Sequence, residues 1–141
     1  MNKFHRFTNR LLFASVLATT LTACDTAAAT QTTTLAPLPA VVEEYFAGWN
    51  AFDGQRVLAT FTPDGIYADP SVPDGVSGPA LAANVEKFKG YSFKLLSYGY
   101  LADGSPEILW EMFDPSGKFL VKGKDIITIV NGKLARVQGS W

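Results

Sequence analysis

The sequence predicts an α+β domain in which helices come first and a meander of long antiparallel strands follows. Three helical segments precede residue 89, whereas four strand-like runs occupy most of the chain after it. Two strong hairpin turns, Asp114-Pro115-Ser116-Gly117 and Asn131-Gly132, connect these strand-like runs. Helices and strands segregated in this order are typical of α+β folds. A curved sheet with helices on its concave side would enclose a pocket.

The first helix is expected over residues 39–52, and its apolar side chains recur at helical spacing: Val41, Val42, Tyr45, Phe46 and Trp49. Pro39 suits the first turn of this helix because its missing N–H is not needed there. Asp53 is expected to cap a second, short helix that carries Val57, Leu58 and Phe61.

Between the second helix and the long strands, the sequence predicts a turn, a short strand, a loop and a third helix. Pro63-Asp64-Gly65 predicts a turn, and Ile66–Asp69 predicts a short strand that Pro70 ends. Residues 71–78 predict a loop, and residues 79–88 predict a third helix. The four longer strands are expected at 92–101, 107–113, 118–130 and 133–141.

Asp125 interrupts the apolar face of the most strand-like run, residues 119–130. Side chains alternate between the two faces of a strand, so Asp125 shares its face with Phe119, Val121, Ile127 and Ile129. The carboxyl group is therefore expected to point inward. Burial disfavours the charged form, which predicts a raised pKa for Asp125. A residue that breaks the pattern in this way is a candidate for a functional site.

Residues 1–24 combine three basic side chains, an apolar stretch over 11–21 and the ending Leu21-Thr22-Ala23-Cys24. The apolar stretch is short for a membrane span. This order resembles a bacterial lipoprotein signal peptide with its lipobox. The resemblance implies cleavage before Cys24 and lipid on that cysteine, which anchors the protein to a membrane of the cell envelope. Asp25 implies the inner membrane if the host is enteric-like. An ordinary secretory signal with a coincidental cysteine is the alternative.

The expected organisation is therefore a signal peptide over 1–23, a lipidated Cys24 with a Thr- and Ala-rich tether over 24–38, and one domain over 39–141. Cleavage before Cys24 removes three of the 12 Lys and Arg residues and none of the 13 Asp and Glu residues. The mature chain is acidic with scattered charges, so we expect no nucleic-acid partner.

The residue inventory excludes several chemistries. The only histidine, His5, lies in the signal peptide, and Cys24 is the only cysteine. The mature chain therefore lacks Ser-His-Asp and Cys-His catalysis in their usual forms, and it lacks His/Cys zinc sites. It also has neither of the phosphate-binding patterns GxGxxG and GxxxxGKS/T. We expect no metal and no cofactor, so any acid–base chemistry falls to carboxylates, Tyr and Lys.

Three stretches resemble the SnoaL-like / nuclear-transport-factor-2-like superfamily: VVEEYFAGWNAFDGQRVLATFTPDGIYADP, GVSGPA and GKDIITIVNGKLARVQGSW. The most specific pieces are the Tyr-Phe-x-x-Trp-Asn helix, Asp69-Pro70 after a short strand, and Asp125 ahead of Asn131-Gly132-Lys133. The resemblance implies a cystatin-like α+β roll, a cone of curved mixed or antiparallel sheet closed by N-terminal helices. Members include ketosteroid isomerases, polyketide cyclases and non-catalytic binding domains, so the fold alone assigns no activity.

The ketosteroid isomerase branch implies roles for three residues. Tyr45 falls at the helix tyrosine and Asp125 at a protonated acid, which together donate hydrogen bonds to a substrate oxyanion. Asp69 falls at the aspartate that shuttles the proton. That isomerase is a known example of a carboxylic acid kept neutral by an apolar site. A carboxylate can take a proton next to a carbonyl, and fixed donors stabilise the enolate charge that develops.

Each of these residues also has a structural interpretation. Tyr45 belongs to an apolar helical stripe, Asp69 could cap a turn, and Asp125 could pair with Lys94 or Arg136. Further candidates to line the cavity are Trp49, Tyr67, Tyr98 and Trp110. The sequence thus predicts a small apolar ligand in the cone with carboxylate-mediated proton transfer. The alternative is a non-catalytic ligand-binding or assembly domain, and the resemblance implies a homodimer.

Overall fold

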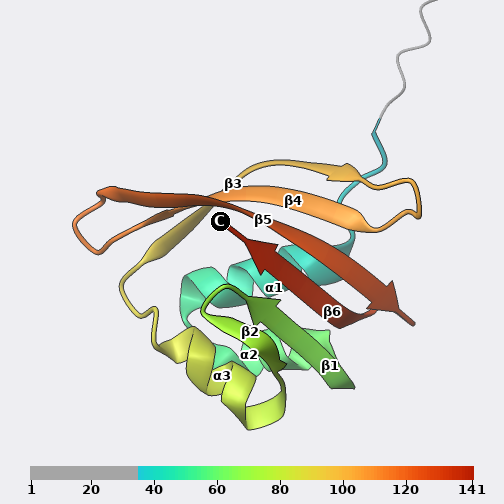
Figure 1. Ribbon diagram of the computed structural model, residues 1–141, viewed down its shortest axis with the longest axis horizontal. Helices are drawn as coiled ribbons and strands as arrows, with labels where there is room; N and C mark the ends of the chain where they lie inside the picture. Colours follow the sequence, from blue (N-terminus) through green and yellow to red (C-terminus); the bar gives the residue numbers. More distant parts are fainter. Residues whose placement is uncertain (1–34) are drawn as a thin grey trace, which may run out of the picture. The chain divides into compact units, whose positions relative to one another are not determined.

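The computed structural model describes residues 35–141, and all structural statements refer to this range (Figure 1). The predicted signal peptide, Cys24, Asp25 and most of the tether lie outside it. The elements are α1 (Ala40–Ala51), α2 (Gly54–Thr60), β1 (Phe61–Asp69), β2 (Val72–Val76), α3 (Gly78–Glu86), β3 (Ser92–Tyr100), β4 (Pro106–Phe113), β5 (Phe119–Val130) and β6 (Lys133–Ser140).

The three predicted helices are present, and local chemistry explains their limits. Helix α1 buries Val42, Tyr45 and Trp49 on one face, as its helical spacing predicted. It ends at Phe52, whose left-handed backbone turns the chain. Asp53 then caps α2, because its carboxylate accepts a 2.9 Å hydrogen bond from the Arg56 N–H.

The strands form one mixed sheet in the order β2-β1-β6-β5-β4-β3. Strands β3 to β6 make an antiparallel meander, as the two hairpin turns predicted. Asn131 and Gly132 both have positive φ, at 51° and 73°, which suits the tight turn between β5 and β6. Strand β1 pairs with β6 in parallel, and so brings the end of β1 beside the end of the chain.

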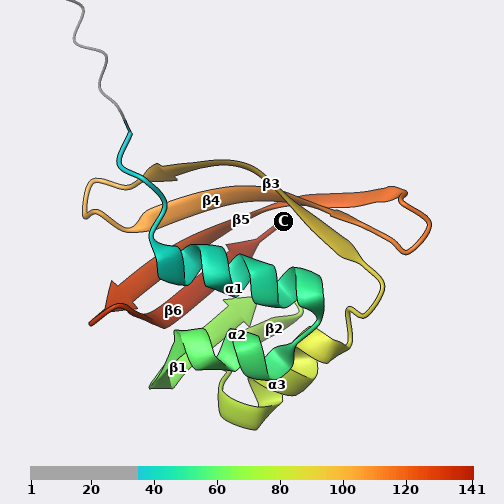
Figure 2. The same ribbon diagram turned by 180° about the vertical axis from the view of Figure 1, so that it is seen from behind.

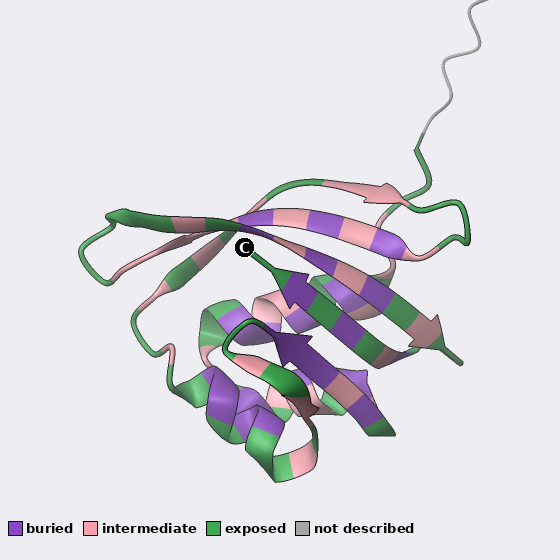
Figure 3. Ribbon diagram, in the orientation of Figure 1, coloured by how far each residue is buried: buried purple, intermediate pink, exposed green. Residues whose placement is uncertain are grey.

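All three helices cover the same face of the sheet (Figures 1 and 2). Helix α1 contacts β3 and β6, whereas α2 and α3 contact β1. Figure 3 shows that buried residues alternate with partly buried or exposed ones along the middle of β5 and along β6, so that one face of each strand joins the core. The core lies between this face and the helices. It includes Val42, Leu81, Ile108, Ile127 and Val137, all fully buried.

Three predictions for the chain between α2 and α3 are wrong. Residues 63–65 do not reverse the chain but lie within β1, where the β1–β6 register shifts between Phe61 and Ile66. The extra residues form a bulge-like irregularity, which accommodates Pro and Gly in a strand. Residues 71–78 are not only a loop, because β2 pairs antiparallel with β1. Phe61, which we expected to belong to the second helix, begins β1.

Candidate functional site

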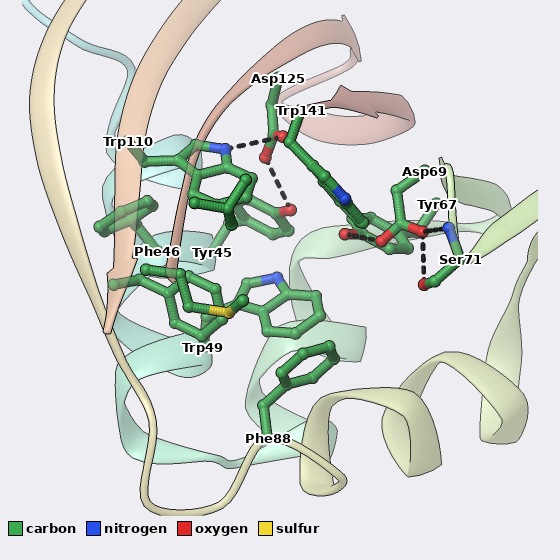
Figure 4. A pocket seen from close by; sticks show the side chains of 13 residues that line it. Tyr45, Phe46, Trp49, Tyr67, Asp69, Ser71, Phe88, Trp110, Asp125 and Trp141 are labelled. Carbon is green, nitrogen blue, oxygen red and sulfur yellow. Dashed lines mark hydrogen bonds between the residues drawn. The ribbon is translucent and has the colours of Figure 1, made fainter. Parts of the chain in front are cut away.

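A cavity of about 220 Å³ lies between the helices and the concave face of the sheet (Figure 4). Helix α1 and strands β1, β3, β4 and β5 all contribute to its wall, and Trp141 at the end of the chain completes it. Eight of the 13 lining residues are aromatic. The lining residues are Tyr45, Phe46, Trp49, Tyr67, Asp69, Ser71, Phe88, Phe93, Trp110, Met112, Val121, Asp125 and Trp141.

Asp125 reaches this cavity from β5 and accepts hydrogen bonds from two side chains. The Tyr45 hydroxyl donates to its Oδ2 at 3.2 Å, and the Trp110 indole donates from Nε1 to its Oδ1 at 2.9 Å. Burial raises the pKa of Asp125 to about 6, and the charge of Asp69 adds to this effect. The donors Trp110 and Tyr45 oppose the shift because they favour the ionised form. Asp125 is therefore a hydrogen-bond acceptor whose ionised form predominates above pH 6.

Two glycines make room for this arrangement. Gly123 faces Trp110 across the β4–β5 ladder, and a β-carbon on Gly123 would stand 2.3 Å from the indole ring. Gly139 faces Asp125 across the β5–β6 ladder. A β-carbon on Gly139 would stand 3.1 Å from the Asp69 Cβ and 3.2 Å from the Asp125 Oδ1. Asp69 on β1 and Asp125 on β5 thus both lie next to Gly139, on the strand β6 between them.

Asp69 ends β1 and accepts four hydrogen bonds. Its Oδ1 accepts from the Ser71 N–H at 2.7 Å, the Ser71 hydroxyl at 2.6 Å and the Val72 N–H at 3.0 Å. Its Oδ2 accepts from the Tyr67 hydroxyl at 2.6 Å. The Oδ1 contacts close the turn between β1 and β2, a common use of an aspartate that precedes a turn. Of the donors to Asp69, Tyr67 and Ser71 line the cavity, and Tyr67 is the one that binds Oδ2.

The two tyrosines that bind these acids are neutral donors. Burial raises the pKa of Tyr45 well above its ordinary value, and the charge of Asp125 raises it further. Burial likewise raises the pKa of Tyr67, followed by the charge of Asp125 and the bond to Asp69. Each phenol therefore keeps its proton throughout the pH range in which Asp125 titrates.

Solved structures share this architecture at low sequence identity. An NTF2-like protein of unknown function from Cytophaga hutchinsonii superposes with a TM-score of 0.60 at 11% identity, over 76% of this chain and 91% of that one. A SnoaL-like family protein from Agrobacterium tumefaciens, provisionally named an isomerase, has a TM-score of 0.57 at 22% identity, over 72% and 93%. The described domain has the NTF2-like fold. The α+β cone and cystatin-like roll expected from the resemblance are thus confirmed.

A third protein of NTF2-like architecture is described as having a ketosteroid isomerase-like fold. It comes from Catenulispora acidiphila and is in complex with trimethylamine. It superposes with a TM-score of 0.61 at 12% identity, over 74% of this chain and 87% of that one. No protein-family model matches the sequence, and no curated protein is significantly similar to it.

The NTF2-like domain brings the three predicted site residues together. Tyr45, Asp69 and Asp125 line one cavity, and so do Trp49, Tyr67 and Trp110. Tyr98 is not part of this lining, and its expected place there is wrong. It packs edge-on against Tyr100 with ring centroids 6.4 Å apart, and Tyr100 in turn binds the Pro37 carbonyl.

The partners of Asp125 differ from the charged pairing that was one expectation. Its partners are the uncharged Tyr45 and Trp110 rather than Lys94 or Arg136. In this structure its carboxylate accepts from these two donors, and the donor role toward a substrate that the resemblance implies stays a prediction. The raised pKa itself has the direction expected from burial.

Sequence reasoning missed several wall residues, among them Ser71, Phe88 and Met112. A signal for Ser71 was present, because a serine two residues after an aspartate often forms a turn with it. Within residues 35–141, no three potential ligands cluster as a metal site would require. No helix of that range has the length and apolar character needed to cross a membrane.

Proposed function

We propose that the domain binds a small, largely apolar molecule in this cavity and transfers a proton on it through a carboxylate. The observation that carries the proposal is the convergence of Asp69 and Asp125 on one aromatic cavity. Apolar walls with a few polar groups are typical of ligand pockets. The similarity to provisionally named polyketide cyclase and isomerase proteins supports this class of reaction. The protein of ketosteroid isomerase-like fold in complex with trimethylamine supports the binding of a small molecule by this architecture.

Asp125 is the stronger candidate for the group that carries the proton. Its pKa of about 6 lies near neutrality, where a carboxylate both takes and releases protons efficiently. Asp69 is the candidate that the isomerase resemblance implies, but it accepts four hydrogen bonds, two of them at 2.6 Å. Asp125 accepts two, at 2.9 Å and 3.2 Å. We therefore infer that Asp125 is the base. Asp69 has a supporting role, because it holds the turn at the edge of the cavity and its charge raises the pKa of Asp125.

The reaction to test is the isomerisation of 3-cyclohexenone to its conjugated isomer. The base removes a proton from the carbon between the carbonyl and the double bond, and the electron pair moves onto the oxygen as a dienolate. The same acid then returns the proton to the far end of the former double bond. Formation of the conjugated enone is followed by its ultraviolet absorbance.

The variants Asp125→Asn and Asp69→Asn separate the two candidate bases, and Asp74→Asn on the exposed part of β2 is the matched control. We expect Asp125→Asn to abolish turnover and Asp74→Asn to leave it unchanged. Loss of turnover in Asp69→Asn alone would transfer the role to Asp69. If the wild type is as inert as both variants across a panel of β,γ-unsaturated ketones, the domain does not catalyse this reaction.

A binding domain without catalysis is the second candidate. It is favoured by the four hydrogen bonds that Asp69 accepts, which leave this acid fully occupied within the protein. Such a domain would retain a ligand in native mass spectrometry without converting it. The resemblance also implies a homodimer, and exposed Phe119, Leu120 and Val130 on β5 offer apolar surface for one. A monomer without ligand in that measurement would contradict this second candidate.

The same proposal includes a lipid anchor at Cys24 that holds the domain at a membrane of the bacterial cell envelope. The three basic side chains, the apolar stretch and the lipobox of residues 1–24 support it. Cells fed labelled palmitate are expected to label the wild-type protein and not Cys24→Ser. Label on both proteins, or on neither, would remove the anchor from the proposal.

A further inference from the structure

The indole nitrogen of Trp49 is a buried hydrogen-bond donor without a partner. Trp49 is only 5% exposed, and its Nε1 forms no hydrogen bond within residues 35–141. One other buried side-chain atom of that range shares this condition, the Asn84 Nδ2, which lies outside the cavity. A buried donor that forms no hydrogen bond costs about 1–3 kcal/mol, so native proteins leave few of them.

The N–H of Trp49 points into the cavity. Figure 4 shows its nitrogen turned toward the space bounded by the Tyr45 hydroxyl and Trp141. Four aromatic neighbours hold the ring in this orientation, with centroid distances of 6.3 Å to Tyr45, 5.4 Å to Tyr67, 5.7 Å to Phe88 and 5.5 Å to Phe93. The indole is thus fixed by packing and not by a bond of its own N–H.

The other buried donors of the cavity wall are already engaged. Tyr45 and Trp110 donate to Asp125, and Tyr67 donates to Asp69. The isomerase resemblance assigned Tyr45 and a neutral Asp125 to a substrate oxygen. In the structure these two residues bind each other instead. Trp49 is the buried donor of this wall that remains for a ligand.

We propose that Trp49 donates its indole N–H to an acceptor oxygen of the ligand, and that the ligand is a small ketone or enone with an apolar body. This inference rests on the proposed function and names the substrate class and the residue that recognises it. A hydrocarbon offers no acceptor, and an alkylammonium ion offers only donors, so neither satisfies the N–H. In the proton transfer, negative charge develops on the carbonyl oxygen, and a donor fixed in a dry site stabilises that charge.

The Tyr45 hydroxyl is the competing acceptor. The Trp49 N–H lies near enough to the Tyr45 hydroxyl to act on it as a donor, which lowers the pKa of Tyr45 against the larger effect of burial. Its Nε1 nevertheless lies outside hydrogen-bond geometry with any acceptor in residues 35–141. A small rotation could close that gap in the free protein. Two states must therefore be distinguished: a Trp49 N–H that donates to the ligand, and one that donates to the Tyr45 hydroxyl.

The experiment follows the indole N–H signals of the purified full-length protein by NMR. The chain has three tryptophans, whose signals are assigned by Trp→Phe variants. The probes are 2-cyclohexenone, the matched hydrocarbon cyclohexene, and cyclohexylammonium. The Met112 methyl signal reports occupancy of the cavity independently, because Met112 lines it without a polar group. We expect cyclohexenone and cyclohexene to shift Met112, and only cyclohexenone to move the Trp49 N–H downfield.

Affinities give the second readout. A single neutral hydrogen bond is worth about 1 kcal/mol, so cyclohexenone should bind roughly fivefold more tightly than cyclohexene. Trp49→Phe should reduce this ratio to about one, because the hydrocarbon controls for the change in cavity shape. Tyr98→Phe removes a hydroxyl from an aromatic residue outside the cavity and should keep the ratio.

Five results would overturn the inference. Cyclohexenone could shift Met112 without moving the Trp49 N–H, or Trp49→Phe could keep the wild-type ratio, and both would leave the proposed binding intact. Preferential binding of cyclohexylammonium would assign the cavity to cations instead. An N–H signal already shifted in the free protein, and released by Tyr45→Phe, would assign the donor to Tyr45. If no probe shifts Met112, the proposed function fails together with the inference.

Discussion

The indole ring of Trp110 lies directly over Gly123, its register partner on the neighbouring strand β5. Because Gly123 has no side chain, the ring can lie over it, and its Nε1 reaches the Asp125 Oδ1 at 2.9 Å. Any side chain at position 123 would occupy the volume of the ring, since its β-carbon would stand 2.3 Å from the Trp110 Cζ2. A glycine two residues before the acid is thus part of the site.

Gly123→Ala should therefore damage both stability and the site. The new methyl group must displace the indole, and overpacking of this kind costs roughly 1–3 kcal/mol. We expect this loss in the free energy of unfolding by urea, together with an upfield shift of the Trp110 N–H as its bond to Asp125 breaks. Gly99→Ala is the matched control, because a β-carbon at Gly99 meets nothing within 4 Å. Equal losses in both variants would show that the contact with Trp110 is not the cause.

Asp125 should make the domain less stable as pH rises from about 4 to 6. Burial raises its folded pKa to about 6 from an ordinary value of 3.8, so the folded state binds the proton more tightly than the unfolded chain does. The free energy of unfolding falls wherever the folded state holds more protons than the unfolded state. The shift corresponds to about 3 kcal/mol between the ends of this window.

The measurement is urea unfolding across this pH range, with Asp125→Asn as the test variant. An asparagine keeps the shape and does not titrate, so this component of the slope should vanish. Asp74→Asn removes an exposed carboxylate and serves as control. A carboxyl ¹³C titration checks the pKa directly. A midpoint of Asp125 near 4, or an unchanged slope in Asp125→Asn, would disprove the prediction.

Tyr45→Phe should raise the pKa of Asp125 further. The hydroxyl donates from α1 to a carboxylate on β5 and so favours the ionised form. Its removal should also cost about 1 kcal/mol of stability, the usual worth of such a bond. The ¹³C titration should show a midpoint above the wild-type value, whereas Tyr98→Phe should leave it in place. An unchanged midpoint in Tyr45→Phe would mean that the 3.2 Å contact contributes little.

Much of the fold follows from local patterns. Helical spacing placed α1, the Asp53 cap placed α2, and the two hairpin turns placed β4, β5 and β6. Strand β2 and the start of β1 were missed because Pro63, Gly65, Pro73 and Gly75 disfavour strands on their own. The start of β1 is held by pairing with β6, which is remote in sequence and lies in no local window. Strand β2 pairs with β1, which is nearby in sequence but itself depends on β6.

The features of the site also divide into those that follow from local pattern and those that depend on strand pairing. Alternation along β5 predicted that Asp125 points inward, because that property depends only on the strand itself. Its bond to Trp110 depends on the β4–β5 register and on the bare backbone at Gly123, and neither is visible before the strands are paired. Consequently the residue types of the site could be predicted, whereas the direction of its hydrogen bonds could not.

The two oxygens of Asp69 should prove to have separate roles. Oδ1 accepts from the Ser71 hydroxyl and from two backbone N–H groups, which hold the turn into β2. Oδ2 accepts only from the Tyr67 hydroxyl, which belongs to the cavity wall. Ser71→Ala should therefore lower stability by roughly 1 kcal/mol and leave the Tyr67–Oδ2 hydrogen bond in place, so that affinity changes less than in Tyr67→Phe.

Tyr67→Phe should also affect the ligand. It leaves the turn intact but frees Oδ2 within a cavity that already holds the charge of Asp125, and an unpaired charge there costs more than a neutral contact. We expect the affinity for the largely apolar 2-cyclohexenone to fall at least several-fold in Tyr67→Phe but not in Ser71→Ala. Calorimetric titration of both variants between pH 5 and 8 measures this. If Ser71→Ala and Tyr67→Phe change stability and affinity in parallel, Asp69 acts as one rigid structural unit, and its oxygens have no separate roles.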